Sequence, residues 1–316
     1  MKYDLSAIGE DQIRITVPQG ERLSSTRNLR MTAAGSEANV AGLLAQLGRN
    51  TTWGTVLPRG PVARRVISEY RASGMNMDNV KRVEEGRVAL YFLEPGEPPM
   101  PGRVIYDRLH TPFRSAKPED FNRDDLLDTE IFFLTGITAA LTEDTANIVQ
   151  FAARQAKERG IKLVLDVNHR TTLWSNEDAG RVLTPVAELA DLLLCSRKDA
   201  AAVFGIEADG VEVSQKLRER FGSTHVVSTD GVRGVYMSSE SEGEDTFAVS
   251  RVPVIDRPGA GDSFVAGTIH GYLNDDVRSG ISYGQRTSAF ALTHHGDLTT
   301  LSPRELDIPI TDDIVR

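Results

Sequence analysis

The residues best suited to chemistry lie near the carboxyl end, in the run from Asp256 to Phe264 (DRPGAGDSF). A loop with two glycines runs here directly into a helical pattern. Glycines let a backbone approach a phosphate, and the first N–H groups of a helix point at that anion. Asp262 places a proton acceptor beside it, as phosphoryl transfer requires. On composition alone a second interpretation stands equally: Asp262 complements the helix dipole and the glycines only form a turn.

A second glycine-containing segment lies near the amino end, residues 35–41 (GSEANVA), followed by Leu47-Gly48. Together with the Gly-Ala-Gly-Asp run, it resembles the two signatures of the ribokinase-like (PfkB) carbohydrate kinases, and the resemblance covers essentially the whole chain. A Walker A loop and the protein-kinase catalytic-loop pattern are absent, which excludes P-loop and protein kinases. The resemblance implies an ATP-dependent carbohydrate kinase that uses Mg²⁺ and is stimulated by a monovalent cation such as K⁺ near the catalytic loop.

The resemblance also implies roles for single residues. Asp262 is the catalytic base, and the backbone N–H groups of Gly259, Ala260 and Gly261 form an anion hole for the transferred phosphoryl group. The stretch 229–234 resembles a strand-end turn that contacts ATP phosphates, and it also predicts a hairpin turn before residues 235–237. Residues 283–296 resemble the wall around the adenine. The expected cofactor-binding residues are Ser196, Thr229, Gly231, Gly234, Gly259 and Gly261.

Three places depart from the family pattern. Many relatives carry Asn-x-x-Glu near the metal, whereas this chain has Ser196-Arg197-Lys198-Asp199, in which Asp199 is the expected Mg²⁺ residue. Glu10, Asp11 and Gln12 compete for the place of the usual acidic residue after the first strand. The common Thr-Thr of the catalytic loop is Arg257-Pro258, and Arg257 is expected to adjust phosphate binding.

Within the family the chain looks most like the 2-keto-3-deoxygluconate kinases. Residues 165–170 (LDVNHR), followed by Leu173-Trp174, resemble the strand and loop that present an arginine to an acidic sugar. A sugar carboxylate needs cationic partners, and the planar fork of arginine suits it better than lysine. The expected substrate-binding residues are Gly35, Asn39, Tyr91, Tyr106, Arg108, Asn168, Arg170 and Asp262.

These substrate assignments have structural alternatives. Arg170 can pair with a structural carboxylate, Tyr91 and Tyr106 can simply pack on strands, and Asp166 and Asn168 can hold a loop. The sequence predicts phosphorylation of 2-keto-3-deoxygluconate to the 6-phosphate. A kinase for fructose, another ketohexose or another deoxy sugar acid is the alternative within the same chemistry. An inactive sugar-binding regulator of the same fold is the alternative outside it.

Short β-rich runs alternate with amphipathic helical patterns, which predicts an α/β fold with a mainly parallel sheet. The family resemblance makes this a ribokinase-like three-layer sandwich, a single domain over residues 1–316. Strands are expected at residues 3–8, 51–56, 131–134, 163–167, 192–195 and 225–228. Helices are expected at residues 36–47, 62–70, 260–273 and 276–294.

Four strand-like runs without intervening helices, at residues 14–17, 29–32, 88–93 and 103–106, predict a small β-sheet. This sheet would form a lid from segments near 12–33 and 87–108, with the proline-rich residues 95–101 as a turn between two strands. Apolar residues such as Val88, Leu90 and Phe92 give the lid a face to bury. We therefore expect a homo-oligomer formed through the lid. The polar stretch 238–245 is expected to be a solvated hairpin loop.

Composition narrows the class of protein further. The chain has 316 residues, of which 40% are hydrophobic and 26% charged, as in ordinary globular proteins. A net charge of -9 argues against non-specific nucleic-acid binding. No signal peptide and no apolar run of about 20 residues is present, so we expect no membrane partner and a cytoplasmic protein. Cys195 is the single cysteine, which excludes an intrachain disulfide and predicts a small buried apolar side chain.

Overall fold

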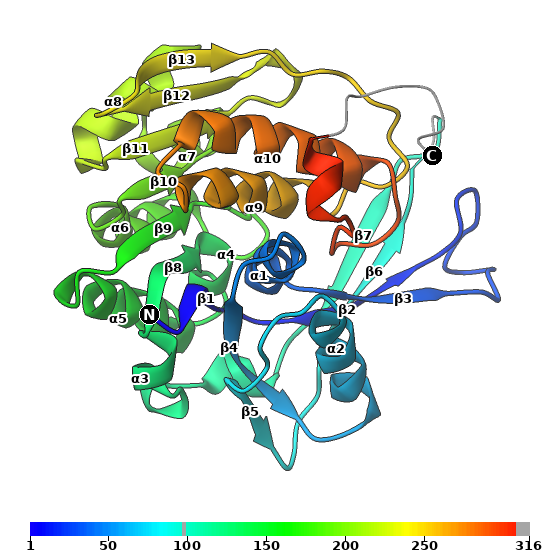
Figure 1. Cartoon of the computed structure of the whole chain (residues 1–316). Coiled ribbons are helices and arrows are strands. Elements are labelled where there is room, and N and C mark those ends of the chain that lie inside the picture. Colours follow the sequence, from blue (N-terminus) through cyan, green and yellow to red (C-terminus); the bar gives the residue numbers. More distant parts are fainter. Residues whose placement is uncertain (97–98, 308–316) are drawn as a thin grey trace.

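The computed structural model describes residues 1–96 and 99–307, which form one large and one small sheet (Figure 1). Within this part, the large sheet has nine strands in the order β13-β12-β11-β10-β9-β8-β1-β4-β5. Every pairing from β5 to β11 is parallel, and β12 runs antiparallel to both of its neighbours. The strands are β1 (Tyr3–Ile8), β4 (Thr51–Pro58), β5 (Val80–Val83), β8 (Thr129–Thr135), β9 (Lys162–Asp166), β10 (Leu192–Leu194), β11 (His225–Thr229), β12 (Val235–Ser239) and β13 (Gly243–Phe247).

Helices cover both faces of this sheet, because successive side chains of a strand point to opposite faces. In β8, Ile131 and Phe133 pack into one apolar cluster, whereas Phe132 and Leu134 pack into another. The first cluster is covered by α1 (Ser36–Gln46), α2 (Pro61–Ala72), α9 (Ala260–Tyr272) and α10 (Val277–Leu292). The second is covered by α3 (Arg123–Leu126), α4 (Gly136–Ala139), α5 (Glu143–Glu158), α6 (Asn176–Ala187), α7 (Arg197–Phe204) and α8 (Val211–Phe221). The predicted three-layer sandwich is confirmed.

The small sheet stands off the main body and has the order β3-β2-β6-β7 (Figure 1). Its strands are β2 (Gln12–Thr16), β3 (Arg30–Ala34), β6 (Ala89–Glu94) and β7 (Arg103–Asp107). Tyr91, Leu93, Val104 and Tyr106 line a cavity on one face. The opposite face carries an apolar row in register, Met31, Ile15, Phe92 and Ile105. The predicted lid strands are therefore present; the expected turn at 95–101 includes residues 97–98, which lie outside the described residues.

The sequence pattern and the structure differ in three places. The stretch 238–245 is not simply a loop, because β12 continues to Ser239 and β13 begins at Gly243. The pattern missed β13 because this edge strand is polar and largely exposed. The short edge strand β5 was not predicted, nor were the 3₁₀ helices η1 (Pro112–Ser115), η2 (Pro118–Asp120), η3 (Gly231–Arg233) and η4 (Pro303–Leu306). Cys195 is buried and unpaired, as predicted.

Among the described residues, no helix has the length and apolar character that crossing a membrane requires.

The chain order fixes where a site can lie. The strand order reverses between β1 and β8, because the chain leaves β1 toward β4 and later returns to place β8 on the other side. Ligands of such sheets bind beyond the carboxyl ends of the strands at this switch point. Asn168, Ser196 and Thr229, which follow or end β9, β10 and β11, lie at this edge. The fold thus brings these predicted residues to one end of the sheet.

Candidate active site

A cavity of about 1280 Å³ opens between the carboxyl edge of the large sheet and the lid. Ligand sites usually occupy roughly 300–1,000 Å³, so this cavity has room for two ligands side by side. Most of the predicted site residues line it: Gly35, Asn39, Tyr91, Tyr106, Asn168, Arg170, Ser196, Asp199, Thr229, Gly231, Gly259, Ala260, Gly261 and Asp262. Arg108 and Gly234 do not line it.

The Gly-Ala-Gly run forms the start of α9. Gly259 is the N-cap residue with φ 85°, and a Cβ there would lie 2.0 Å from the carbonyl oxygen of Asp297, so only glycine fits. A Cβ on Gly261 would meet no atom within 4 Å, because this residue faces open space. The first N–H groups of a helix have no partner four residues earlier. The Ala260 N–H makes a long hydrogen bond of 3.4 Å to the Arg257 carbonyl. The first turn of α9 is therefore arranged to receive an anion.

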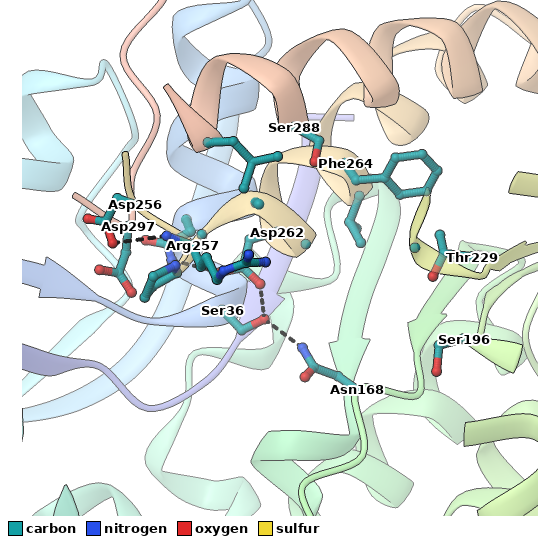
Figure 2. A pocket seen from close by; sticks show the side chains of 18 of the residues that line it. Ser36, Asn168, Ser196, Thr229, Asp256, Arg257, Asp262, Phe264, Ser288 and Asp297 are labelled. Atoms are coloured by element: carbon teal, nitrogen blue, oxygen red, sulfur yellow. Dashed lines mark hydrogen bonds between the residues drawn. The ribbon is translucent and has the colours of Figure 1, made fainter. Parts of the chain in front are cut away.

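Asp262 is held at the first turn of α9 by two side chains from α1. The Ser36 hydroxyl donates to Oδ1 at 2.7 Å (Figure 2). Asn39 Nδ2 donates to Oδ2 at 2.8 Å. Burial raises the pKa of Asp262 above its usual value, while these two hydrogen bonds and the charge of Arg170 act in the opposite direction. The carboxylate is thus fixed in orientation and is more basic than an exposed aspartate, as a general base requires.

Asp166 and Asp199 are two of the further carboxylates that line the cavity with Asp262. Burial, together with the charges of Asp262 and Asp199, raises the pKa of Asp166 to about 7. Burial also raises the pKa of Asp199, whose backbone N–H donates to the capping Ser196 hydroxyl at 3.0 Å. Such a group of acids fits a cation. In the described part of the chain, however, no three Asp, Glu, His or Cys side chains converge to hold a metal alone. A Mg²⁺ ion here would take most of its ligands from phosphate oxygens and water, as this metal commonly does.

The predicted sugar end of the cavity is built from the loop after β9 and from the lid. Asn168 has a left-handed backbone, φ 37°, and its amide donates to the Ser36 hydroxyl at 3.1 Å and to Asp166 at 3.2 Å. Arg170 is exposed at the cavity wall and forms no ion pair with the described residues. The Tyr91 and Tyr106 rings lie 5.8 Å apart. Arg170 is therefore available to a ligand.

Arg108 is placed differently from Arg170. It is buried, and its guanidinium donates to Glu10 Oε2 at 3.1 Å. The Thr111 hydroxyl also donates to this carboxylate, and the guanidinium stacks over Tyr106 at 5.6 Å from the ring centroid. The structure thus joins Arg108 to the lid and to the end of β1 rather than to the cavity. Its role as a substrate ligand stays a prediction.

The three residues after β1 that are candidates for the family's usual acidic residue lie in different surroundings. Glu10 is taken up by Arg108, and Asp11 is buried behind Gly35, where a Cβ would lie 2.7 Å from Asp11 Oδ2. Gln12 alone of the three lines the cavity, and its Oε1 atom has no hydrogen-bond partner within the described part of the chain. Gln12 is therefore the one of these residues that can contact a ligand directly.

The other end of the cavity has the character of a nucleotide site. Thr229 and Gly231 lie where β11 ends, in a turn closed by a 2.9 Å bond from the Asp230 N–H to the Gly234 carbonyl. This hairpin turn was predicted. Helices α9 and α10 and the stretch before α9 add an apolar wall with a few polar groups: Val249, Val252, Val254, Ile255, Phe264, Tyr283, Ser288, Ala289 and Leu292. The predicted adenine wall from 283 to 296 thus borders the cavity in part.

The structure places in the site some residues that the sequence pattern does not mark. Ser36 lies within the amino-terminal motif, and its neighbours Gly35 and Asn39 gave the signal that would have included it. Asp256 and Asp297 flank the catalytic loop beside Asp262 (Figure 2). Both are bound by Arg14 of β2, with Nη2 at 2.5 Å from Asp256 and Nη1 at 2.9 Å from Asp297. No pattern in the sequence links these three residues.

A doubly wound sheet, a β lid and a glycine-rich helix start beside a held carboxylate are the features expected of a ribokinase-like phosphotransferase. The family model of the pfkB family carbohydrate kinases matches residues 2–304, so the chain belongs to this family and is a carbohydrate kinase.

Its relatives within this family include kinases that are named for keto-deoxy sugar acids. The chain is 31% identical to a 2-dehydro-3-deoxygalactonokinase of Haloferax volcanii, over 97% of this chain and 96% of the relative. It is 27% identical to a 2-dehydro-3-deoxygluconokinase of Thermoproteus tenax, over 96% and 93%. The crystal structure of a 2-dehydro-3-deoxygluconokinase from Thermotoga maritima matches with a TM-score of 0.89 and 28% identity, over 97% of this chain and 98% of that one.

Proposed function

We propose that this kinase transfers the γ-phosphoryl group of ATP to the primary hydroxyl of 2-keto-3-deoxygluconate, giving the 6-phosphate and ADP. The name 2-dehydro-3-deoxygluconate denotes the same sugar acid. The galactonate form, its C4 epimer, belongs to the same substrate class. The observation that carries the proposal is Arg170, an exposed guanidinium on the wall of the cavity that holds Asp262, with no ion-pair partner among residues 1–96 and 99–307. The sugar-acid names of the relatives support it.

In the proposed reaction, Asp262 accepts the proton of the sugar hydroxyl. Ser36 and Asn39 hold its two oxygens, so the carboxylate needs no reorientation when the nucleophile arrives. The N–H groups at Gly259, Ala260 and Gly261 stabilise charge that develops on the transferred phosphoryl group. These residues supply positioning, proton acceptance and charge stabilisation, which are the main requirements of phosphoryl transfer.

The remaining cavity residues divide between the two substrates. Gly35, Asn39, Tyr91, Tyr106, Asn168 and Gln12 would contact the sugar, and Arg170 its carboxylate. Ser196, Thr229 and Gly231 would contact the phosphates of ATP, and the apolar wall beside α10 would hold the adenine. Asp199 and Asp166 would hold Mg²⁺ through water, and this ion, when bound, neutralises charge on the phosphates.

The lid provides a surface for a second copy of the chain. Its outer face carries the row Met31, Ile15, Phe92 and Ile105, of which Met31 is 40% and Ile105 46% exposed. Apolar side chains in adjacent strands form a patch of the kind that mediates association. We therefore propose a homo-oligomer in which the lids pack against each other.

An ADP-release assay over acidic and neutral sugars tests the proposal. The panel contains 2-keto-3-deoxygluconate, 2-keto-3-deoxygalactonate, gluconate and fructose, each with Mg²⁺ and ATP. We expect the highest kcat/KM for a 2-keto-3-deoxy sugar acid, and the ratio of the two epimers defines the preference at C4. A preference for fructose would overturn the substrate assignment. Asp262→Asn measured in parallel separates genuine turnover from contaminating ATPase activity.

A further inference from the structure

Arg14 joins the lid to both segments that shape the anion hole. Its side chain is only 3% exposed and lies on β2, facing the main body of the protein. Its Nη2 donates to Asp256 Oδ2 at 2.5 Å, and its Nη1 donates to Asp297 Oδ1 at 2.9 Å. Its Nε donates to the Thr16 hydroxyl at 2.6 Å. One buried guanidinium therefore bridges two buried carboxylates, whose side chains are 5% and 9% exposed.

The two carboxylates are tied to the catalytic loop. Asp256 begins the loop, and its Oδ1 accepts from the backbone N–H of Arg257 at 3.0 Å. Its Oδ2 also accepts from the Gly296 N–H at 3.2 Å. The neighbouring Asp297 carbonyl packs against Gly259 so closely that a Cβ there would lie 2.0 Å away. A displacement of either aspartate would therefore move the backbone of the anion hole.

The family resemblance implies a monovalent cation near this loop, and the residues of this chain do not fit one. Such an ion needs several oxygen ligands, and among the residues that the structure describes the carboxylates next to the loop, other than Asp262, are Asp256 and Asp297. Both already accept from Arg14, and Asp297 Oδ2 accepts the Tyr91 hydroxyl at 2.7 Å. His295, a largely exposed side chain, places its Nδ1 atom 4.0 Å from Asp256 Oδ2. A second cation beside a buried guanidinium would be repelled and would lack free carboxylate oxygens.

We propose that Arg14 is a built-in cation that takes the place of a monovalent ion in this kinase. The guanidinium neutralises Asp256 and Asp297 and fixes the loop and the segment around Asp297 relative to the lid. Arg14 is thus a positioning residue that acts through the anion hole. Turnover should then be independent of K⁺ and Na⁺. The inference rests on the kinase activity and not on which sugar is phosphorylated.

Wild-type turnover is measured with Mg²⁺ and ATP at constant ionic strength in KCl, NaCl or tetramethylammonium chloride. The last cation is too large to enter a compact oxygen site. We expect the three kcat values to agree within about twofold, which is the scatter of such assays. A twofold difference corresponds to about 0.4 kcal/mol in the activation free energy. A wild type that needs K⁺ or Na⁺ for turnover overturns the proposal. If no sugar is phosphorylated, the melting temperature in the same three salts decides, and stabilisation by K⁺ counts against the proposal.

Arg14→Met tests whether the charge of Arg14 is needed, because methionine keeps an apolar stem and removes the charge. We expect kcat in tetramethylammonium chloride to fall on the order of 100-fold, the effect of disturbing an oxyanion site. K⁺ should restore part of this loss and raise the melting temperature of the variant, since the two carboxylates are then unpaired. Arg14→Lys should retain more activity and show no response to K⁺. Equal kcat of Arg14→Met and wild type in every salt would contradict the positioning role.

A matched control is Arg87→Met, which removes another lid arginine. Arg87 is exposed and pairs with Asp107 at 2.7 Å, away from the catalytic loop. We expect neither its kcat nor its melting temperature to respond to the salt. If Arg14→Met does not fold, Arg14→Lys and the wild-type salt series still decide between a built-in cation and a bound one.

Discussion

Arg170→Ala should damage the phosphorylation of an acidic sugar far more than that of a neutral one. Arg170 is exposed at the cavity wall and has no carboxylate partner among the described residues, so its guanidinium is available to a substrate carboxylate. A charge-assisted contact contributes about 1.5–3 kcal/mol, which corresponds to about 10–150-fold in kcat/KM. Solvent screening at this exposed position places the expected loss toward the lower end of that range.

The assay is kcat/KM for 2-keto-3-deoxygluconate and for fructose in the wild type and in each variant. Fructose lacks the carboxylate, so its weak turnover should hardly change in Arg170→Ala. Arg170→Lys should recover only part of the loss, because a point charge cannot reproduce a two-pronged contact. Equal losses on both sugars would refute the reasoning and would make Arg170 a structural or ATP-binding residue.

Arg108→Ala distinguishes the role of Arg108 from that of Arg170, the other arginine that the sequence assigned to the sugar. Arg108 is buried and paired with Glu10, so its removal leaves an unpaired buried carboxylate under the lid. We therefore expect losses of similar size on the acidic and the neutral sugar, with a lower melting temperature. A loss confined to the acidic sugar would show that Arg108 leaves Glu10 and binds the substrate carboxylate.

The cavity and the lid lead to four more predictions. Because burial raises the pKa of the base Asp262, kcat/KM should fall on acidification at a pH above the usual aspartate range, whereas a flat profile down to pH 4 would contradict this. The pKa of Asp166 is raised to about 7, so between pH 4 and 7 the folded protein retains a proton that the unfolded chain releases. The free energy of unfolding of the ligand-free protein should therefore fall from pH 4 to 7. Asp166→Asn should melt a few degrees higher than the wild type at pH 8 but not at pH 4. Excess chelator should abolish turnover and Mg²⁺ or Mn²⁺ should restore it, since the charge of ATP must be neutralised; full activity in chelator would exclude a metal role for Asp199. Ile105→Lys on the lid should shift the mass measured by light scattering toward the monomer, and an unchanged mass would place the interface elsewhere.

Much of the fold is predictable from the sequence because each main strand and helix carries its own pattern. The strand at Tyr3–Ile8 and the helix that begins at Ser36 lie where the apolar spacing put them. The edge strands β5 and β13 escaped prediction because few of their side chains are buried, and burial is what produces the pattern. The position of the lid was predictable from strands that lack intervening helices.

The site also contains residues that the sequence predicts and residues that it does not. Glycines and Asp262 lie in one short segment, so their joint role can be predicted from local spacing. The ion pairs of Arg14 and Arg108 cannot, because each joins residues that are distant in sequence and that carry no mark of their partner. A charged residue on a strand gives the same sequence signal whether it faces solvent, a ligand or a buried carboxylate. Only the register of the lid against the main body distinguishes these cases.

The most direct test of the account is the kcat of Asp262→Asn on the best sugar substrate. The amide has nearly the size of the carboxylate and can still pair with Ser36 and Asn39, but it cannot accept the proton of the sugar hydroxyl. We expect kcat to fall by roughly 10²–10⁴-fold, the usual contribution of general-base catalysis, with sugar and ATP binding and the melting temperature close to those of the wild type. A variant with near-normal kcat and unchanged KM would show that Asp262 is not the base of this kinase.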